Sequence, residues 1–171
     1  MQSMFKKIIR VLIFTALVSC EVIAQDSAHA YKEWITGAIG LGPPFESPKL
    51  EKVSFGLTYN FGWHMFFYQA GYNLIRQLLS GRGIYKEESF NLGLGARKGG
   101  KWTHVAFFTG PSVIKVNAGG QVSTVVGLGL NLQGFVKLGS DFGVGLDIYE
   151  SVNPVQNMFA IRFGLSVTNA K

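Results

Sequence analysis

From residue 33 onward, bulky apolar residues alternate with small or polar residues along most of the chain. Five segments show this alternation without a break: 53–60, 90–97, 126–133, 142–149 and 159–167. In the last segment every odd-numbered position from Phe159 to Val167 is bulky and apolar, while the positions between are Ala, Arg, Gly and Ser. A period of two is typical of β-strands that have one apolar face.

Three further segments, 34–42, 64–75 and 102–110, show the pattern less cleanly and bring the expected strands to eight. In 102–110 we favour Val105 and Phe107 on the apolar face, because the opposite assignment places His104 there with Phe108. Short connections alternate with long ones, and no domain linker interrupts them. The short connections are 60–62, 97–101 and 138–141, and the long ones are 43–50, 76–87, 111–121 and 150–157. This order predicts consecutive antiparallel hairpins.

The first residues have the composition of an export signal. Lys6, Lys7 and Arg10 precede an apolar stretch, Val11–Val18, that is shorter than the roughly 20 residues needed to cross a bilayer as a helix. The small residues at the end of this region allow signal cleavage after Ala24 as one interpretation.

The sequence around Cys20 offers a second interpretation, because Leu17–Cys20 resembles a bacterial lipobox in which that cysteine is lipidated. Both interpretations predict export from the cytoplasm. The expected organisation is a signal peptide at 1–24, a periplasmic lead-in at 25–32 and a β-barrel at 33–171.

Composition narrows the class of protein. Hydrophobic residues make up 47% and charged residues 15%, which argues against a disordered chain, and 22 glycines argue against a helical bundle. The single cysteine excludes a disulfide framework and a cysteine-built zinc site. Removing residues 1–24 takes away three of 16 basic and one of 10 acidic residues, so the net charge falls from +6 to +4. The remaining basic residues are scattered, which argues against nucleic-acid binding.

The direction of the apolar face separates a soluble barrel from a membrane barrel. An apolar face turned inward would have to fit several large side chains per strand into an eight-stranded lumen, and would leave an outer surface poor in charge. An apolar face turned outward meets lipid, while glycines and small polar groups fit the narrow lumen. None of the five clean apolar faces carries a charge. The pattern therefore predicts an all-β, eight-stranded, antiparallel up-and-down transmembrane barrel.

The chain resembles the small eight-stranded outer-membrane barrels of Gram-negative bacteria, the OmpA/OmpX-like group. The resemblance covers roughly residues 33–168 and rests on the hairpin pattern, on Gly93-Leu94 and Gly127–Leu130, and on the final apolar series to Val167. It implies an outer-membrane location, with membrane lipid and the barrel-assembly machinery as partners. Many such barrels end on an aromatic residue, whereas this chain ends Thr-Asn-Ala-Lys and Phe163 is the nearest aromatic candidate.

Two sets of residues are expected to have structural roles. Trp34, Trp63, Trp102 and Phe142 are expected at the periplasmic membrane interface. On the polar face we expect the charges of Asp147, Arg162, Glu87, Arg97 and Lys137 to point into the lumen. Asp147 and Arg162 are expected to pair, because they are equidistant from a hairpin centre near residue 154.

The residue patterns predict no catalytic, cofactor or metal residues. His29, His64 and His104 have no spacing that brings ligands together, and none is followed by the His-x-Ser signature of barrel-type lipid A deacylases. The expected function is a non-enzymatic outer-membrane barrel with a structural or surface-interaction role, without a large-solute pore. A lipid- or ligand-binding barrel, either a periplasmic carrier or a loop-mediated binder, is the alternative, and a lipid-modifying enzyme is third. The sequence does not identify a ligand for the external loops.

Overall fold

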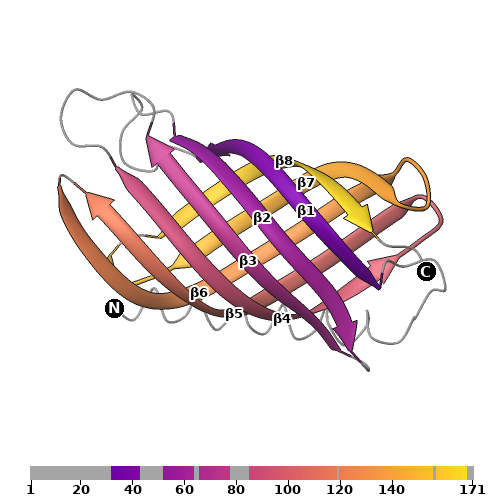
Figure 1. Cartoon of the computed structure of the whole chain (residues 1–171), viewed down its shortest axis with the longest axis horizontal. Coiled ribbons are helices and arrows are strands. Elements are labelled where there is room, and N and C mark those ends of the chain that lie inside the picture. Colours follow the sequence, from indigo (N-terminus) through magenta and orange to yellow (C-terminus); the bar gives the residue numbers. More distant parts are fainter. Residues whose placement is uncertain are drawn as a thin grey trace, which may run out of the picture.

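The computed structural model describes residues 32–42, 52–63, 66–77, 85–118, 120–155 and 157–168. These residues form one closed antiparallel barrel of eight strands (Figure 1). The strands are β1 Glu33–Gly42, β2 Lys52–Trp63, β3 Phe66–Gln77, β4 Lys86–Gly99, β5 Thr103–Ala118, β6 Gln121–Lys137, β7 Phe142–Val152 and β8 Met158–Thr168. The fold class predicted from the alternation is confirmed. No helix among the described residues is long and apolar enough to cross a membrane.

Each strand pairs with its neighbours in sequence, and β1 closes the barrel. Trp34 of β1 lies opposite Asn60 of β2 on one side and opposite Thr168 of β8 on the other. β1 therefore begins at the end of the barrel where β8 finishes. We call this the turn end, because β2 ends and β3 begins there, as do the connections 100–102 and 138–141, and we call the opposite end the loop end.

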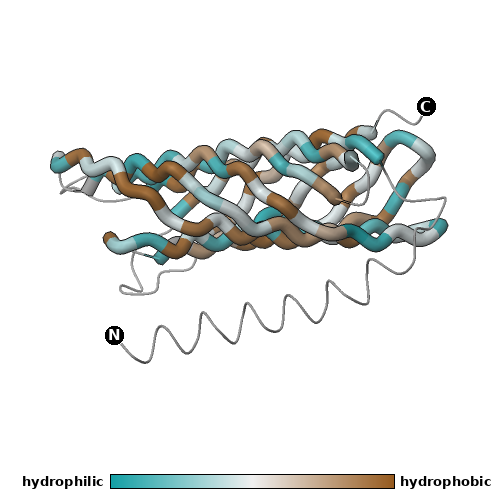
Figure 2. The backbone as a smooth tube through the Cα atoms, turned by 90° about the horizontal axis from the view of Figure 1, so that it is seen from below, coloured by the Kyte–Doolittle hydropathy of each residue, from teal (hydrophilic) through white to brown (hydrophobic). Residues whose placement is uncertain are grey.

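The two faces of the sheet differ as the alternation predicts. Along β8, Ile161, Phe163 and Leu165 point outward and are exposed, while Arg162 and Gly164 are buried in the lumen. On β5, Val105 points outward and His104 and Phe108 are buried, as expected. Figure 2 shows hydrophobic and hydrophilic positions following one another along the strands. The barrel thus turns most of its bulky apolar side chains away from its centre.

The prediction of a long connection at 111–121 is wrong. β5 continues through Pro111 to Ala118, and β6 begins at Gln121. Proline has no N–H to donate, and the ladder between β4 and β5 skips two pairs there before it resumes at Ser112. Gly120 turns the hairpin with φ of +86°, a conformation that favours glycine.

Some strands are also longer than the sequence predicted. β2 runs to Trp63, past the turn expected at 60–62, and β7 runs to Val152. At Gly145 a close approach between strands requires glycine, since a Cβ there would collide with the carbonyl oxygen of Gly134 on β6. The predicted signal segment, including Cys20 and the cleavage site, and most of the predicted lead-in lie outside the described residues.

Candidate functional site

The centre of the lumen contains an ion pair between Arg162 of β8 and Asp147 of β7. The two residues lie directly opposite each other in register. The Nε–H of Arg162 donates to Oδ1 of Asp147 at 2.7 Å, and Nη2 contacts the same oxygen. Both side chains are almost completely shielded, with exposed fractions of 0% and 1%. Because a guanidinium at this depth is removed from bulk solvent, the Asp147 carboxylate supplies the counter-charge that stabilises it.

Other lumen groups hold this pair from neighbouring strands. Nη1 of Arg162 donates to Oδ1 of Asn73 at 2.7 Å, and its guanidinium carbon lies 5.2 Å from the centre of the Tyr149 ring. Oδ2 of Asp147 accepts from Asn131 at 2.9 Å and from Gln133 at 3.4 Å. Both charged groups therefore have several hydrogen-bond partners, as a buried charge requires.

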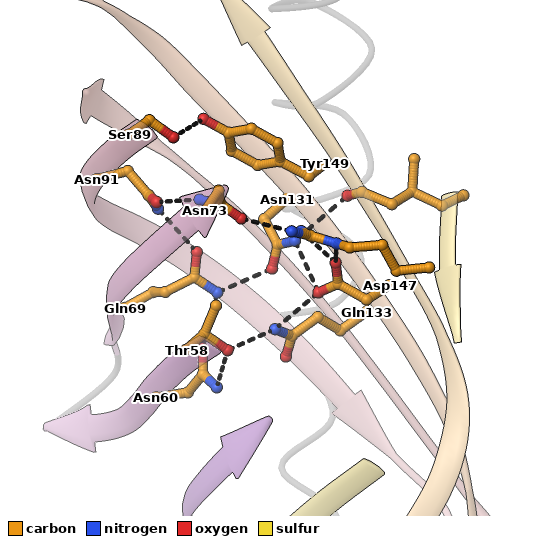
Figure 3. Close-up of polar contacts among 12 residues, drawn as sticks. Thr58, Asn60, Gln69, Asn73, Ser89, Asn91, Asn131, Gln133, Asp147 and Tyr149 are labelled. Carbon is orange, nitrogen blue, oxygen red and sulfur yellow. Dashed lines mark hydrogen bonds and ion pairs between the residues drawn. The ribbon is translucent and has the colours of Figure 1, made fainter. Parts of the chain in front are cut away.

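An amide network extends this arrangement around the lumen (Figure 3). Nε2 of Gln69 donates to Asn60 at 2.8 Å and to Asn131 at 2.9 Å. Asn91 connects Gln69 to Asn73, donating to the first at 3.1 Å and accepting from the second at 2.9 Å. Since each amide offers both donors and an acceptor, these side chains can donate to and accept from one another around the lumen. We call these residues, with Thr58, Gln133, Asp147 and Arg162, the lumen network.

The loop end of the lumen is filled by a mixed cluster. Ile75, Tyr85, Ile114, Val116 and Ala160 form an apolar group there. The hydroxyl of Tyr85 donates to Glu87 at 3.0 Å, and Nζ of Lys52 lies 4.6 Å above the Tyr85 ring. Burial, reinforced by the nearby Glu87 carboxylate, raises the pKa of the Tyr85 phenol, so it remains protonated.

The turn end is filled by aromatic rings. Trp34, Ala106 and Phe108 form a buried group against which Phe67 packs. The His104 ring lies 4.5 Å from the Trp34 ring in an edge-on arrangement. Side chains from β1, β3 and β5 thus fill the lumen between the lumen network and the turn end of the barrel.

The structure places all five predicted lumen charges on the inner face. Glu87, Asp147 and Arg162 are buried. Arg97 is half-buried, with its guanidinium 4.3 Å above the Phe67 ring, and Lys137 donates from Nζ to the carbonyl oxygen of Gly100 at 3.0 Å. Glu87 therefore belongs to the loop-end cluster, and the two cations belong to the turn end. They do not join the central pair.

Trp34 does not lie at the membrane interface, so that expectation is wrong. Its ring is inside the lumen with an exposed fraction of 1%, and its Nε1–H donates to Gln133 at 2.9 Å. The residue shares the even-numbered face of β1 with Thr36 and Ala38, which also point inward. Strand parity and an internal acceptor for the indole N–H outweigh the interfacial preference of tryptophan here.

The other three predicted interfacial aromatics are on the outside of the barrel. Trp63 at the end of β2, Trp102 just before β5 and Phe142 at the start of β7 have exposed fractions of 63%, 65% and 37%. All three lie at the turn end. Nζ of Lys101 is 5.1 Å from the Trp102 ring centre, the combination of cation and aromatic ring that favours a membrane interface.

No group of three or more His, Cys, Asp or Glu side chains within the described part of the chain has the geometry of a metal site. His29 and His64 lie outside that part, and His104 is buried in the lumen. Of the lumen network, the Asp147–Arg162 pair was expected from the sequence, whereas the amide residues were not, although they all fall on the polar face. Their repeated appearance at alternate positions of 58–60, 69–73 and 131–133 was the available signal.

One strand edge is uncovered at the loop end. β6 pairs with β5 from Gln121 onward, but its pairing with β7 starts only at Leu128. Residues 121–127 therefore have no strand on their second side among the described residues, and the hairpin forms the leftmost point of the strands in Figure 1. This segment, Gln-Val-Ser-Thr-Val-Val-Gly, lacks the charges and prolines that usually protect an edge.

Comparison with known proteins supports the fold. No protein-family model matches the chain, and no curated protein matches it. Among solved structures, Neisserial surface protein A matches with a TM-score of 0.56 and 11% identity over 80% of this chain and 95% of its own. Ail, the attachment invasion locus protein of Yersinia pestis, matches with a TM-score of 0.55 and 14% identity, over 79% of this chain and 95% of its own.

The outer-membrane enzyme PagL also matches, with a TM-score of 0.52 and 15% identity over 80% of this chain and 99% of its own. Identities this low show the fold alone. The chain has the fold of the small eight-stranded outer-membrane barrels and so resembles the OmpA/OmpX-like group, as predicted. Because this fold carries enzymes as well as non-enzymatic proteins, it does not by itself define an activity.

Proposed function

We propose that this protein is a non-enzymatic integral outer-membrane barrel that acts at the cell surface through its loop end and forms no pore for large solutes. The observation that carries the proposal is the reversal of polarity: apolar side chains cover the outside, while a hydrogen-bonded polar network occupies the centre of the lumen. A polar lumen with an apolar outer wall is stable only when lipid surrounds the barrel.

The filled lumen supports the absence of a solute pore. The loop-end cluster, the lumen network and the turn-end rings follow one another along the barrel axis. Eight-stranded barrels have interiors just wide enough for side chains to fill, unlike the 16–18-stranded porins. The same packing argues against a soluble lipid carrier, whose cavity would need an apolar lining.

The uncovered edge of the β5–β6 hairpin supports a role in surface interaction. Backbone N–H and C=O groups along an uncovered strand edge can accept an extended segment of another polypeptide as an additional strand. The names of two structural matches, a surface protein and an attachment protein, are consistent with such a role. His104 is buried in the lumen, away from the lipid-facing wall, and this position favours a role in surface interaction over lipid modification.

The orientation assigns the turn end to the periplasm and the loop end to the exterior, because outer-membrane barrels have short periplasmic turns and longer external loops. Insertion by the barrel-assembly machinery is part of the proposal. It would have to use a last strand whose outward aromatics are Phe159 and Phe163.

Cysteine labelling on intact cells tests this orientation. Thr124→Cys lies on the uncovered edge at the loop end, and Ser140→Cys lies in the connection between β6 and β7 at the turn end. We expect a membrane-impermeant maleimide to label Thr124→Cys on intact cells and Ser140→Cys only after permeabilisation. Both variants should also carry Cys20→Ser, with outer-membrane fractionation to establish that export persists. Labelling in the reverse order, or recovery without detergent, would contradict the proposal.

A further inference from the structure

The outer wall of β3, β4 and β5 changes character abruptly near the loop end. Leu74, Phe90 and Val113 point outward and form the upper part of the apolar wall. The next outward positions toward the loop end carry charges. They are Arg76 on β3, Glu88 and Lys86 on β4, and Lys115 on β5, which we call the rim cluster.

The strand register brings these four side chains together. Lys86 lies opposite Arg76, and Glu88 lies opposite Lys115. Residues paired in this way have Cβ atoms about 5 Å apart, within reach of long charged side chains. The rim cluster is therefore one surface formed by three adjacent strands.

The cations of the rim cluster outnumber its single carboxylate. Nζ of Lys86 lies 3.0 Å from Oε1 of Glu88, which also accepts a hydrogen bond from the Tyr72 hydroxyl at 3.0 Å. Arg76 and Lys115 have exposed side chains, and no side-chain hydrogen bond or ion pair within 4 Å is seen for either among the described residues, although the Glu88 carboxylate opposite Lys115 attracts its ammonium group. Two cations thus face the surroundings with their donors available.

The described outward residues near the loop end of the other strands differ from the rim cluster, because none of them is basic. In register with Arg76, the outward residues are Val53 on β2, Leu41 on β1 and Ile161 on β8. One outward position nearer the loop end, Phe159 on β8 is paired with the acidic Glu150 on β7. Among the described residues, the outward-facing positive charge near the loop end is therefore concentrated on β3, β4 and β5. A general belt of interfacial charges would not explain this asymmetry.

We propose that the rim cluster binds the phosphate of a phosphorylated lipid head group in the outer leaflet, with its acyl chains lying along Leu74, Phe90 and Val113. The guanidinium and ammonium groups of Arg76 and Lys115 are suited to phosphate, and Lys86 supplies a third cation. The apolar wall directly below the charges favours a lipid over a free phosphate ion. This inference rests on the proposed membrane insertion with the loop end outward.

Lipid titration of the purified full-length barrel in detergent tests the inference, with native mass spectrometry reporting the affinity of the first bound lipid. The probes are diphosphoryl lipid A and the same lipid with its phosphates removed. Each cation near an anionic lipid surface contributes about a fivefold effect, so the double variant Arg76→Gln/Lys115→Gln should bind the phosphorylated lipid roughly 25-fold more weakly. Glu88→Gln should bind it more tightly, because the repelling carboxylate is gone.

The double variant Lys98→Gln/Lys101→Gln is the matched control, because it removes the same charge from the turn end and should retain the wild-type affinity. Equal losses in both double variants, or no loss in either, would overturn the inference. So would equal binding of the phosphate-free lipid, or competition by inorganic phosphate at the same concentration as lipid. Heat-modifiable gel migration of each sample shows separately whether the barrel is folded, so failure of the proposed barrel is distinguishable from failure of lipid binding.

Discussion

Removal of either member of the Asp147–Arg162 pair should reveal how strongly the lumen network depends on it. In Asp147→Ala the guanidinium of Arg162 stays buried and retains only Asn73, 2.7 Å from Nη1, and the face of Tyr149. In Arg162→Ala the carboxylate of Asp147 stays buried with the amide donors of Asn131 and Gln133. Each single change therefore leaves a charge in the lumen without its counter-charge.

The expected magnitude depends on this burial. Breaking a buried ion pair by removing one partner costs about 3–5 kcal/mol, and two independent losses would sum to about 6–10 kcal/mol. The double variant buries neither charge, so its destabilisation should fall short of that sum. We expect a coupling free energy of about 2–3 kcal/mol between the two residues.

Equilibrium unfolding in urea from phospholipid vesicles, followed by tryptophan fluorescence, measures the four free energies of the double-mutant cycle. The Lys86–Glu88 pair is the matched comparison, since its N–O distance is 3.0 Å but its side chains are 40% and 30% exposed. An exposed pair of this kind should couple by only about 0.2–1 kcal/mol. Additive effects of Asp147→Ala and Arg162→Ala, within about 0.5 kcal/mol, would refute the reasoning.

Three further outcomes are expected. Trp34→Ala should destabilise the barrel by about 3–5 kcal/mol because it empties part of the lumen, whereas Trp63→Ala, on the outer surface, should cost less. Gly56→Ala should destabilise by about 1–3 kcal/mol, because its Cβ would collide with Nη1 of Arg162, while a Cβ at Gly37 meets nothing within 4 Å. Urea unfolding measures both comparisons. Reconstitution into planar bilayers should give no porin-like conductance, and a stable large-conductance pore would contradict the filled lumen.

The faces of the strands could be predicted from the sequence because side-chain direction in a strand depends on position alone. The side chains at odd positions from Phe159 to Val167 point outward and the side chain of Arg162 points inward, as the pattern indicates. The placement of Asp147 opposite Arg162 depends equally on local information, since a hairpin with a known centre fixes its own register.

Trp34 and Pro111 show where residue preferences mislead. Tryptophan near a strand end suggested a membrane interface, but the position shares its face with inward residues and finds an acceptor on Gln133, 99 residues away in sequence. The strand was expected to end before Pro111, yet the loss of one donor only interrupts the ladder locally. For Trp34 a contact across the lumen decides, and for Pro111 the pairing of β5 with β6, which continues through the proline, decides.

The order of residues along the chain is enough to predict the strand pattern, the apolar exterior and the set of residues that point inward. Closure of the barrel decides which of those residues meet. Arg162 reaches Asn73 across 89 positions of sequence, and Gln133 reaches Thr58 across 75, because β1 pairs with β8 and brings all walls around one narrow lumen. Contacts across the lumen depend on strand stagger and barrel diameter, which belong to the whole sheet and to no single hairpin.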